Sequence, residues 1–102
     1  MTRHQEITAI IYDKRGRVLS VGKNDFVKTH PLQKKHAVKV GQPYKEYLHA
    51  EVAAIIKCRD LTRAHTIKVF RYAADGHPSL AKPCAVCASA ITAAGIKHIQ
   101  HT

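Results

Sequence analysis

The 102-residue sequence predicts an α/β fold: a mixed β-sheet of about four strands with helices packed on at least one face.

 Three observations support this prediction. An apolar segment is followed by a tight turn and a second β-branched segment, as in a hairpin. Two later segments carry apolar residues at helical spacing, and each is followed by another apolar segment of strand length. The expected order is β-β-α-β-α-β, and the length fits one domain over residues 1–102.

The hairpin is expected at the start of the chain. Glu6 to Tyr12 is β-branched and largely apolar, which predicts a strand buried on both faces. Residues 13–16 (DKRG) form a turn with Gly16 at the position that most needs a positive φ. Arg17 to Val21 then returns as the second strand, and Gly22 closes the hairpin.

Two helices and two further strands follow in alternation. Apolar residues recur with helical period from His49 to Asp60, which predicts an amphipathic helix. A second helix is expected from Pro83 or Cys84 to about Ala94, with Gly95 just past its end. The segments 66–73 and 96–101 have the composition of strands.

The segment from Lys23 to Tyr47 has weak periodicity and contains Pro31 and Pro43. A short helix is compatible with residues 32–40. Long connections in small domains are usually functional or mobile. Because this one leads directly into the first long helix, we expect it to line a pocket beside that helix.

Two short motifs open the two long helices: HAE at residues 49–51 and PCAVC at residues 83–87. His49 offers an imidazole nitrogen, and Cys84 and Cys87 offer thiolates. Cysteines three residues apart lie on one helix face, and a helix N-terminus favours the thiolate form. Together these residues supply three zinc ligands and leave a fourth tetrahedral position for water. Glu51 would be the acid/base beside that water.

Each motif has other interpretations when it stands alone. A His-x-Glu sequence at a helix start is usually a surface feature, and a Cys-x-x-Cys sequence is also typical of redox pairs or of half a structural zinc site. A closed structural site needs a fourth protein ligand, but Cys58 and the remaining histidines show no suitable spacing. The two motifs together therefore favour a hydrolytic zinc site. Cys58 is expected to be a small buried residue.

Composition indicates the class of partner and the compartment. The net charge is +10, and residues 14–45 contain nine Lys/Arg against one acid, Asp25. This favours phosphate-bearing partners, although basic loops also serve solubility. Three cysteines fit a reducing compartment. With no long apolar run and no signal-peptide pattern, a soluble cytoplasmic protein without a membrane partner is expected.

The sequence resembles the zinc-dependent cytidine/deoxycytidylate deaminase superfamily over most of its length, and especially its small phage-type members, which would place it in the host cytoplasm. The resemblance rests on H-x-E followed by P-C-x-x-C, with SVGKN at 20–24 and AGIKHI at 94–99 in support. It implies Zn²⁺ bound by His49, Cys84 and Cys87, with Glu51 as the catalytic residue. It also implies that Asn24 contacts the substrate sugar or base and that Ala50 contacts the pyrimidine through its backbone.

One departure from this superfamily concerns the sheet. Its members usually have a fifth strand, whereas this chain ends after the fourth expected strand. An uncovered sheet edge is commonly protected by association. We therefore expect a homo-oligomer, in which a second subunit could complete each pocket.

The expected activity is hydrolytic deamination of a cytosine-containing nucleoside or nucleotide to its uracil form, with release of ammonia. Such an enzyme is a hydrolase acting on C–N bonds of cyclic amidines. Four lysines are candidates for binding a 5′-phosphate: Lys23, Lys28, Lys34 and Lys35. One alternative is a deaminase of single-stranded DNA or RNA, for which Phe26, Tyr44 and Tyr47 would have to supply stacking. Another is a non-catalytic nucleic-acid-binding module with structural zinc, which has no need of Glu51.

Overall fold

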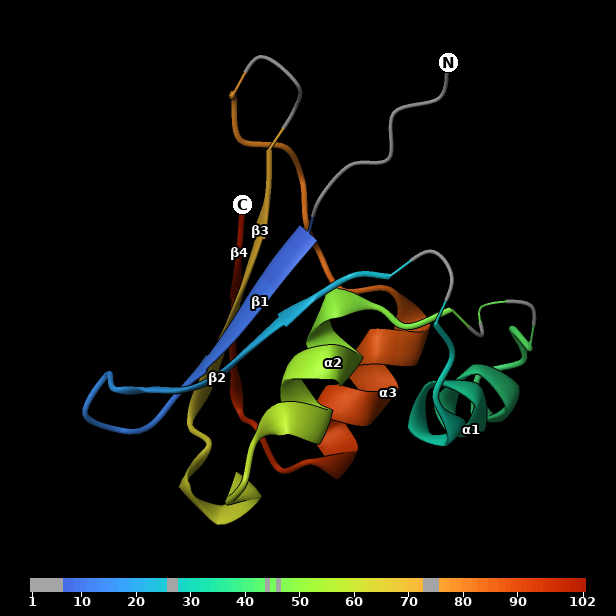
Figure 1. Ribbon diagram of the computed structural model, residues 1–102, viewed down its shortest axis with the longest axis horizontal. Helices are drawn as coiled ribbons and strands as arrows, with labels where there is room; N and C mark the ends of the chain where they lie inside the picture. Colours follow the sequence, from blue (N-terminus) through green and yellow to red (C-terminus); the bar gives the residue numbers. More distant parts are fainter. Residues whose placement is uncertain (1–6, 26–27, 44, 46, 73–75) are drawn as a thin grey trace.

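Four strands form one mixed sheet in the order β2-β1-β3-β4 (Figure 1). In this computed structural model the described residues are 7–25, 28–43, 45, 47–72 and 76–102. Strand β1 is antiparallel to both β2 and β3, and β3 is parallel to β4. The bounds of the strands are β1 Ile7–Tyr12, β2 Val18–Lys23, β3 Thr66–Arg71 and β4 His98–His101. The predicted mixed four-stranded sheet is confirmed.

The predicted hairpin forms between β1 and β2. The amide of Gly16 donates to the carbonyl of Asp13 across 3.0 Å, and Gly16 has a φ of 82°. A side chain at Gly16 would be strained in this left-handed conformation, so the expectation of a positive φ there is confirmed. The second strand extends to Lys23, two residues beyond its expected end at Val21.

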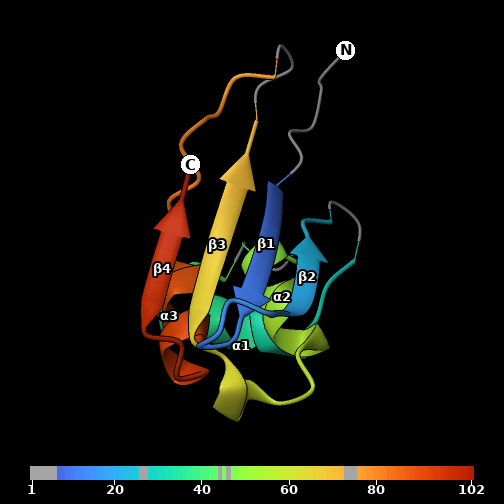
Figure 2. The ribbon, with the colours of Figure 1, turned by 90° about the vertical axis from the view of Figure 1, so that its left-hand side faces the viewer.

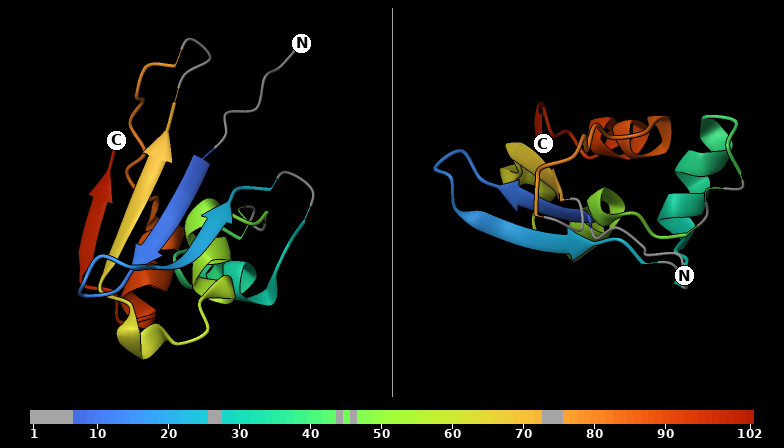
Figure 3. Two further views of the ribbon diagram at one scale, coloured as in Figure 1. Left: turned by 60° about the vertical axis from the view of Figure 1, so that its left-hand side comes forward. Right: turned by 90° about the horizontal axis from the view of Figure 1, so that it is seen from above.

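Within the described residues, three α-helices lie on the same side of the sheet, as Figures 2 and 3 show. Helix α2 packs against β1 and β2, while α3 lies beside α2 and contacts α1. The additional helix α1 lies in the segment whose periodicity was weak, and a 3₁₀-helix, η1, precedes β3. The bounds are α1 Pro31–Lys39, α2 Ala50–Lys57, η1 Leu61–Arg63 and α3 Ala85–Ala93.

The core lies between the sheet and these helices. Ala9 and Ile11 of β1 are fully buried, whereas Thr8 and Ile10, which alternate with them, are only half-buried. The expectation that β1 is buried on both faces is therefore wrong. In the described part of the chain the helices lie on one face of the sheet, so the other face of this apolar strand is only partly covered.

Helix α2 lies unusually close to β2 at Gly22. A Cβ atom built on Gly22 would lie 2.2 Å from the amide nitrogen of Ala54 and 2.4 Å from the carbonyl oxygen of Ala50. No other residue type fits there without moving the helix backbone. Ser20 adds a hydrogen bond of 2.8 Å from its hydroxyl to the Ala54 carbonyl. The start of α2 is thus fixed directly against the sheet.

Several element boundaries differ from the predictions. Helix α2 ends at Lys57 rather than near Asp60, because Cys58 has an extended backbone with a ψ of 116°. Cys58 is buried in the core, as expected. Strand β4 begins at His98 rather than at residue 96. The predicted strand ends at Glu6 and Ala73 lie outside the described residues.

Strands β2 and β4 are the two edges of the sheet. All four residues of β4 are exposed, and Ile99 in its middle is 43% exposed. Association of subunits through an edge stays a prediction. Among the described helices, none has the length and apolar content to cross a bilayer.

Candidate metal centre and substrate cavity

The starts of α2 and α3 bring one imidazole and two thiols together. The ligand atoms of His49, Cys84 and Cys87 all lie within 4.8 Å of one another. Nδ1 of His49 is 3.2 Å from the Cys87 sulfur and 3.6 Å from the Cys84 sulfur. Tetrahedral bonds of zinc to nitrogen and sulfur would place such atoms about 3.5 Å apart. These three residues, hereafter the His/Cys cluster, therefore fit a zinc ion.

Two members of the cluster occupy the N-cap positions of their helices. His49 precedes α2 and Cys84 precedes α3, and both have an extended backbone. Neither side chain makes the hydrogen bond to its own helix that an N-cap residue usually makes. Both side chains instead contribute to the cluster. Cys87, one turn further along α3, completes it.

The backbone of His49 is held by a buried glutamine of α1. The Gln33 side chain is fully buried; it donates to the Lys45 carbonyl across 3.0 Å and accepts from the His49 amide across 3.2 Å. Sequence reasoning missed this residue. The available signal was the helical spacing of Gln33, His36 and Ala37, which places all three on the buried face of α1.

The carboxyl group of Glu51 lies in the first turn of α2, and the residue is only 5% exposed. Burial raises the pKa of this carboxyl above its ordinary value, against smaller opposing effects that include a hydrogen bond with Cys87. A carboxyl group with a raised pKa exchanges its proton more readily near neutral pH. Glu51 is thus suited to proton transfer beside the cluster.

The two thiols of the cluster shift each other's pKa in opposite directions. The pKa of Cys84 is lowered to about 3, first by the hydrogen bond from the Cys87 thiol and also by His49, while burial opposes the shift. The pKa of Cys87 is raised, first because its thiol donates to the Cys84 sulfur and then by burial. Metal binding would release the thiol proton of Cys87, because thiolates are the metal-binding form.

A cavity of about 410 Å³ opens beside the cluster. This is within the usual size of small-molecule sites. The predicted contact residues Asn24 and Ala50 both line it, together with Glu51. The remainder of the wall combines apolar and charged residues: Ile7, Asp25, Lys45, Tyr47, Leu48, Val69, Arg71, Leu80, Ala81 and Lys82.

The cations in this wall are not those expected from the sequence. Lys45, Arg71 and Lys82 line the cavity. The four lysines singled out as phosphate ligands are exposed and are absent from its lining: Lys23, Lys28, Lys34 and Lys35. Three segments distant in sequence thus supply the positive charge near the cluster.

The wall around Asn24 is fixed by hydrogen bonds to the backbone of β1 and of the segment before α2. Oδ1 of Asn24 accepts a hydrogen bond of 3.0 Å from the Ile7 amide, which joins the end of β2 to the start of β1. The Asp25 amide donates to the Leu48 carbonyl across 2.8 Å. The segment expected to line the pocket therefore does so. Of its three aromatic residues, Tyr47 lines the cavity at 49% exposure, whereas Phe26 and Tyr44 lie outside the described residues.

Comparison with known proteins agrees with this geometry. A search of curated proteins found no match for the chain. Residues 2–102 match the family described as "Cytidine and deoxycytidylate deaminase zinc-binding region". The match includes the His/Cys cluster, Glu51 and both helices that carry them. The chain therefore belongs to the cytidine and deoxycytidylate deaminase zinc-binding family.

Proposed function

We propose that this protein catalyses the zinc-dependent hydrolytic deamination of a cytosine nucleotide, giving the uracil form and ammonia. The observation that carries the proposal is the position of Glu51. Glu51 is buried and lines the same cavity as His49 and Cys84. It lies in the first turn of α2, directly after the N-cap residue His49. A purely structural metal site would not require a buried acid at this place.

In the proposed site, His49, Cys84 and Cys87 hold the metal. Zinc, when bound, supplies the Lewis acidity that makes water a nucleophile near neutral pH. Glu51 accepts the proton of the attacking water and delivers it to the ring nitrogen beside the amino-bearing carbon. The carbon–oxygen bond then forms. Glu51 takes the remaining proton of the new hydroxyl group and transfers it to the amino group as the carbon–nitrogen bond breaks and the carbonyl forms. Ammonia leaves, and the uracil ring remains.

The cavity wall supports a substrate with a phosphate group. Lys45, Arg71 and Lys82 outnumber the two acidic residues, Asp25 and Glu51, in the lining of this cavity. Its apolar wall includes Val69 and Leu80. Phosphate oxygens form strong charge-assisted hydrogen bonds with such cations. A free nucleoside would use only the apolar part and the Asn24 region. A cytosine nucleotide would contact this part and, through its phosphate group, the cations as well.

The proposal is tested by following ammonia release from the zinc-loaded protein. The substrates to compare are cytidine, deoxycytidine, dCMP, dCTP and a cytosine-containing oligonucleotide. We expect turnover of the mononucleotides at higher kcat/KM than of the nucleosides. A protein that binds zinc and releases no ammonia from any of these substrates would refute the proposal, and preference for the oligonucleotide would replace it with polynucleotide deamination.

The matched variant for this assay is Glu51→Gln, which keeps the size of the side chain and removes its acid/base function. We expect turnover to fall by about 10²–10⁴, the usual contribution of a general acid–base group. Zinc content, measured by metal analysis, should stay at the wild-type value. Undiminished turnover in this variant would remove Glu51 from the mechanism.

A further inference from the structure

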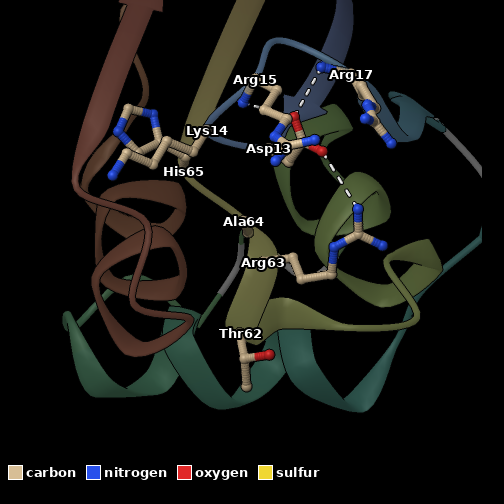
Figure 4. A pocket seen from close by; sticks show the side chains of 8 residues that line it. All are labelled: Asp13, Lys14, Arg15, Arg17, Thr62, Arg63, Ala64 and His65. Atoms are coloured by element: carbon tan, nitrogen blue, oxygen red, sulfur yellow. Dashed lines mark hydrogen bonds and ion pairs between the residues drawn. The ribbon is translucent and has the colours of Figure 1, made fainter.

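A second cavity, of about 390 Å³, lies at the opposite end of the sheet from the His/Cys cluster. It is formed where the β1–β2 turn meets η1 and the start of β3 (Figure 4). The six residues of β1 separate the two ends by roughly 20 Å. We call this cavity the basic pocket; its lining residues are Asp13, Lys14, Arg15, Arg17, Thr62, Arg63, Ala64 and His65.

The basic pocket has a strong excess of positive charge. Four of its residues are Lys or Arg: Lys14, Arg15, Arg17 and Arg63. One residue, Asp13, is acidic, which leaves a net charge of +3 (four minus one) with His65 neutral. All four of these residues are exposed, so the charge faces solvent. Such a local excess attracts anions from solution.

The single carboxylate of the pocket is already committed to holding the loops in place. Asp13 is 7% exposed, and its Oδ1 accepts hydrogen bonds from the amides of Arg15 and Arg17 at 2.9 and 2.8 Å. Its Oδ2 accepts from Nη2 of Arg63 at 3.3 Å, as Figure 4 shows. The hydrogen bond from Arg17 is the main reason why the pKa of Asp13 is lowered. Asp13 therefore stays charged and organises the cations around it.

The geometry points to a binding site for phosphate groups in the basic pocket. Guanidinium groups present several donors in a planar fork that matches phosphate oxygens. Arg63 has more donors than the one used at Asp13. The cations come from two segments, residues 14–17 and residue 63, and the fold brings them to one cavity. Asp13 and Arg63, which are 50 residues apart, join the two segments. This site is separate from the cavity at the His/Cys cluster and uses none of its residues.

The same phosphate chemistry is offered by a free nucleotide and by a nucleic-acid backbone. Three probes distinguish these sources: inorganic pyrophosphate, dATP, and a 12-residue thymidine oligonucleotide, none of which contains cytosine. Each is titrated into the zinc-loaded protein while backbone amides are followed by NMR. We expect all three to shift the amides of residues 14–17 and 62–65. Tighter binding of dATP indicates a free nucleotide, and tighter binding of the oligonucleotide with a steep salt dependence indicates nucleic acid.

The variant for this test is Lys14→Ala combined with Arg15→Ala. Both side chains are exposed, and the substitutions leave the Asp13 contacts with the backbone and with Arg63 in place. The control combines Lys39→Ala with Lys57→Ala, which removes the same charge from exposed positions outside both cavities.

We expect the Kd for pyrophosphate to rise about tenfold or more in the Lys14/Arg15 variant, as for the loss of charge-assisted contacts. The control variant should change it less than about twofold, because neither lysine lines the basic pocket and exposed charges that make no contact with the ligand are screened by salt. Equal weakening in both variants would show a general effect of net charge and overturn the proposal. Shifts confined to residues 80–84, or no binding by the wild type at millimolar pyrophosphate, would overturn it as well.

Discussion

The two ends of the sheet hold charged groups in opposite ways. At the His/Cys cluster, the reactive residues are buried or half-buried and are fixed by helix starts and by Gln33. At the basic pocket, exposed cations surround one buried carboxylate, that of Asp13. The first arrangement restricts each atom to one position, whereas the second leaves long side chains free to adapt.

This difference indicates that the His/Cys cluster requires a rigid framework, whereas the basic pocket does not. Proton transfer and metal binding depend on distances of a few tenths of an ångström, so the cluster is built on helix ends packed against the sheet. Binding of an anion by exposed cations tolerates more variation, because charge attraction falls slowly with distance. Substitutions at the cluster end should therefore have larger effects than equivalent substitutions at the basic pocket.

The largest effect is expected from Cys84→Ser and Cys87→Ser. Each removes one thiolate ligand, so zinc content should fall strongly and deamination should drop to background, with a lower melting temperature because metal binding contributes to folding. Cys58→Ser is the matched control, since Cys58 is buried in the core but is no member of the cluster. It should lose about 1–3 kcal/mol of stability through the buried hydroxyl and keep its zinc. Metal loss in the control would contradict the assignment of ligands.

Glycines at the two ends allow a direct comparison. Gly22→Ala would place a Cβ 2.2 Å from the backbone of α2, so the helix must move. We expect the free energy of unfolding to fall by about 1–3 kcal/mol. Activity should fall as well, because α2 carries Glu51. Gly16→Ala meets no atom within 4 Å and only has to adopt a positive φ, which should cost about 1 kcal/mol. Chemical denaturation measures both. Equal losses would contradict the difference in rigidity between the two ends.

A smaller effect is expected for binding at the cluster cavity. Lys82→Ala removes one cation from the cavity wall, so KM for dCMP should rise about tenfold while KM for deoxycytidine stays nearly unchanged. Steady-state kinetics with both substrates measures the difference. Lys57→Ala, which removes an exposed lysine outside the cavity, is the control and should affect neither KM. Parallel increases for both substrates would assign Lys82 a role other than phosphate binding.

Much of the fold and of the cluster follows from local sequence patterns. The turn ending at Gly16 predicts the hairpin, and Gly95, with a φ of 81°, follows α3 as expected. The positions of His49 and of the two cluster cysteines at helix starts were also predictable, because capping and periodicity are local properties. These signals need only a few neighbouring residues.

Contacts between distant segments could not be predicted in this way. The pairing of Gln33 with His49 depends on how α1 packs, and the pairing of Arg63 with Asp13 joins residues 50 apart. The same holds for the cavity cations Lys45 and Arg71, which no motif marks. The packing of all three helices on one face of the sheet is likewise decided by tertiary contacts rather than by the composition of a strand.

The smallest effect is expected from a buried histidine that joins α1 to the cluster helix α3. His36 is 3% exposed, and its Nδ1 lies 2.8 Å from the Ser89 hydroxyl. Burial lowers the pKa of His36, and the charges of Lys39 and Lys35 lower it further. In the unfolded chain this histidine has its ordinary pKa near 6.5.

The sign of the resulting pH dependence follows from proton uptake. Below about pH 6.5 the unfolded chain binds a proton at His36 that the folded protein binds less readily, so stability falls as the pH decreases through the lowered pKa. His36→Gln should remove this contribution. Between pH 7.5 and pH 5, the denaturant midpoint should therefore fall less in the variant than in the wild type. Every other histidine is the same in the two proteins. An equal fall in both proteins would show that folding does not lower the pKa of His36, and that the contact between α1 and α3 does not depend on its neutral form.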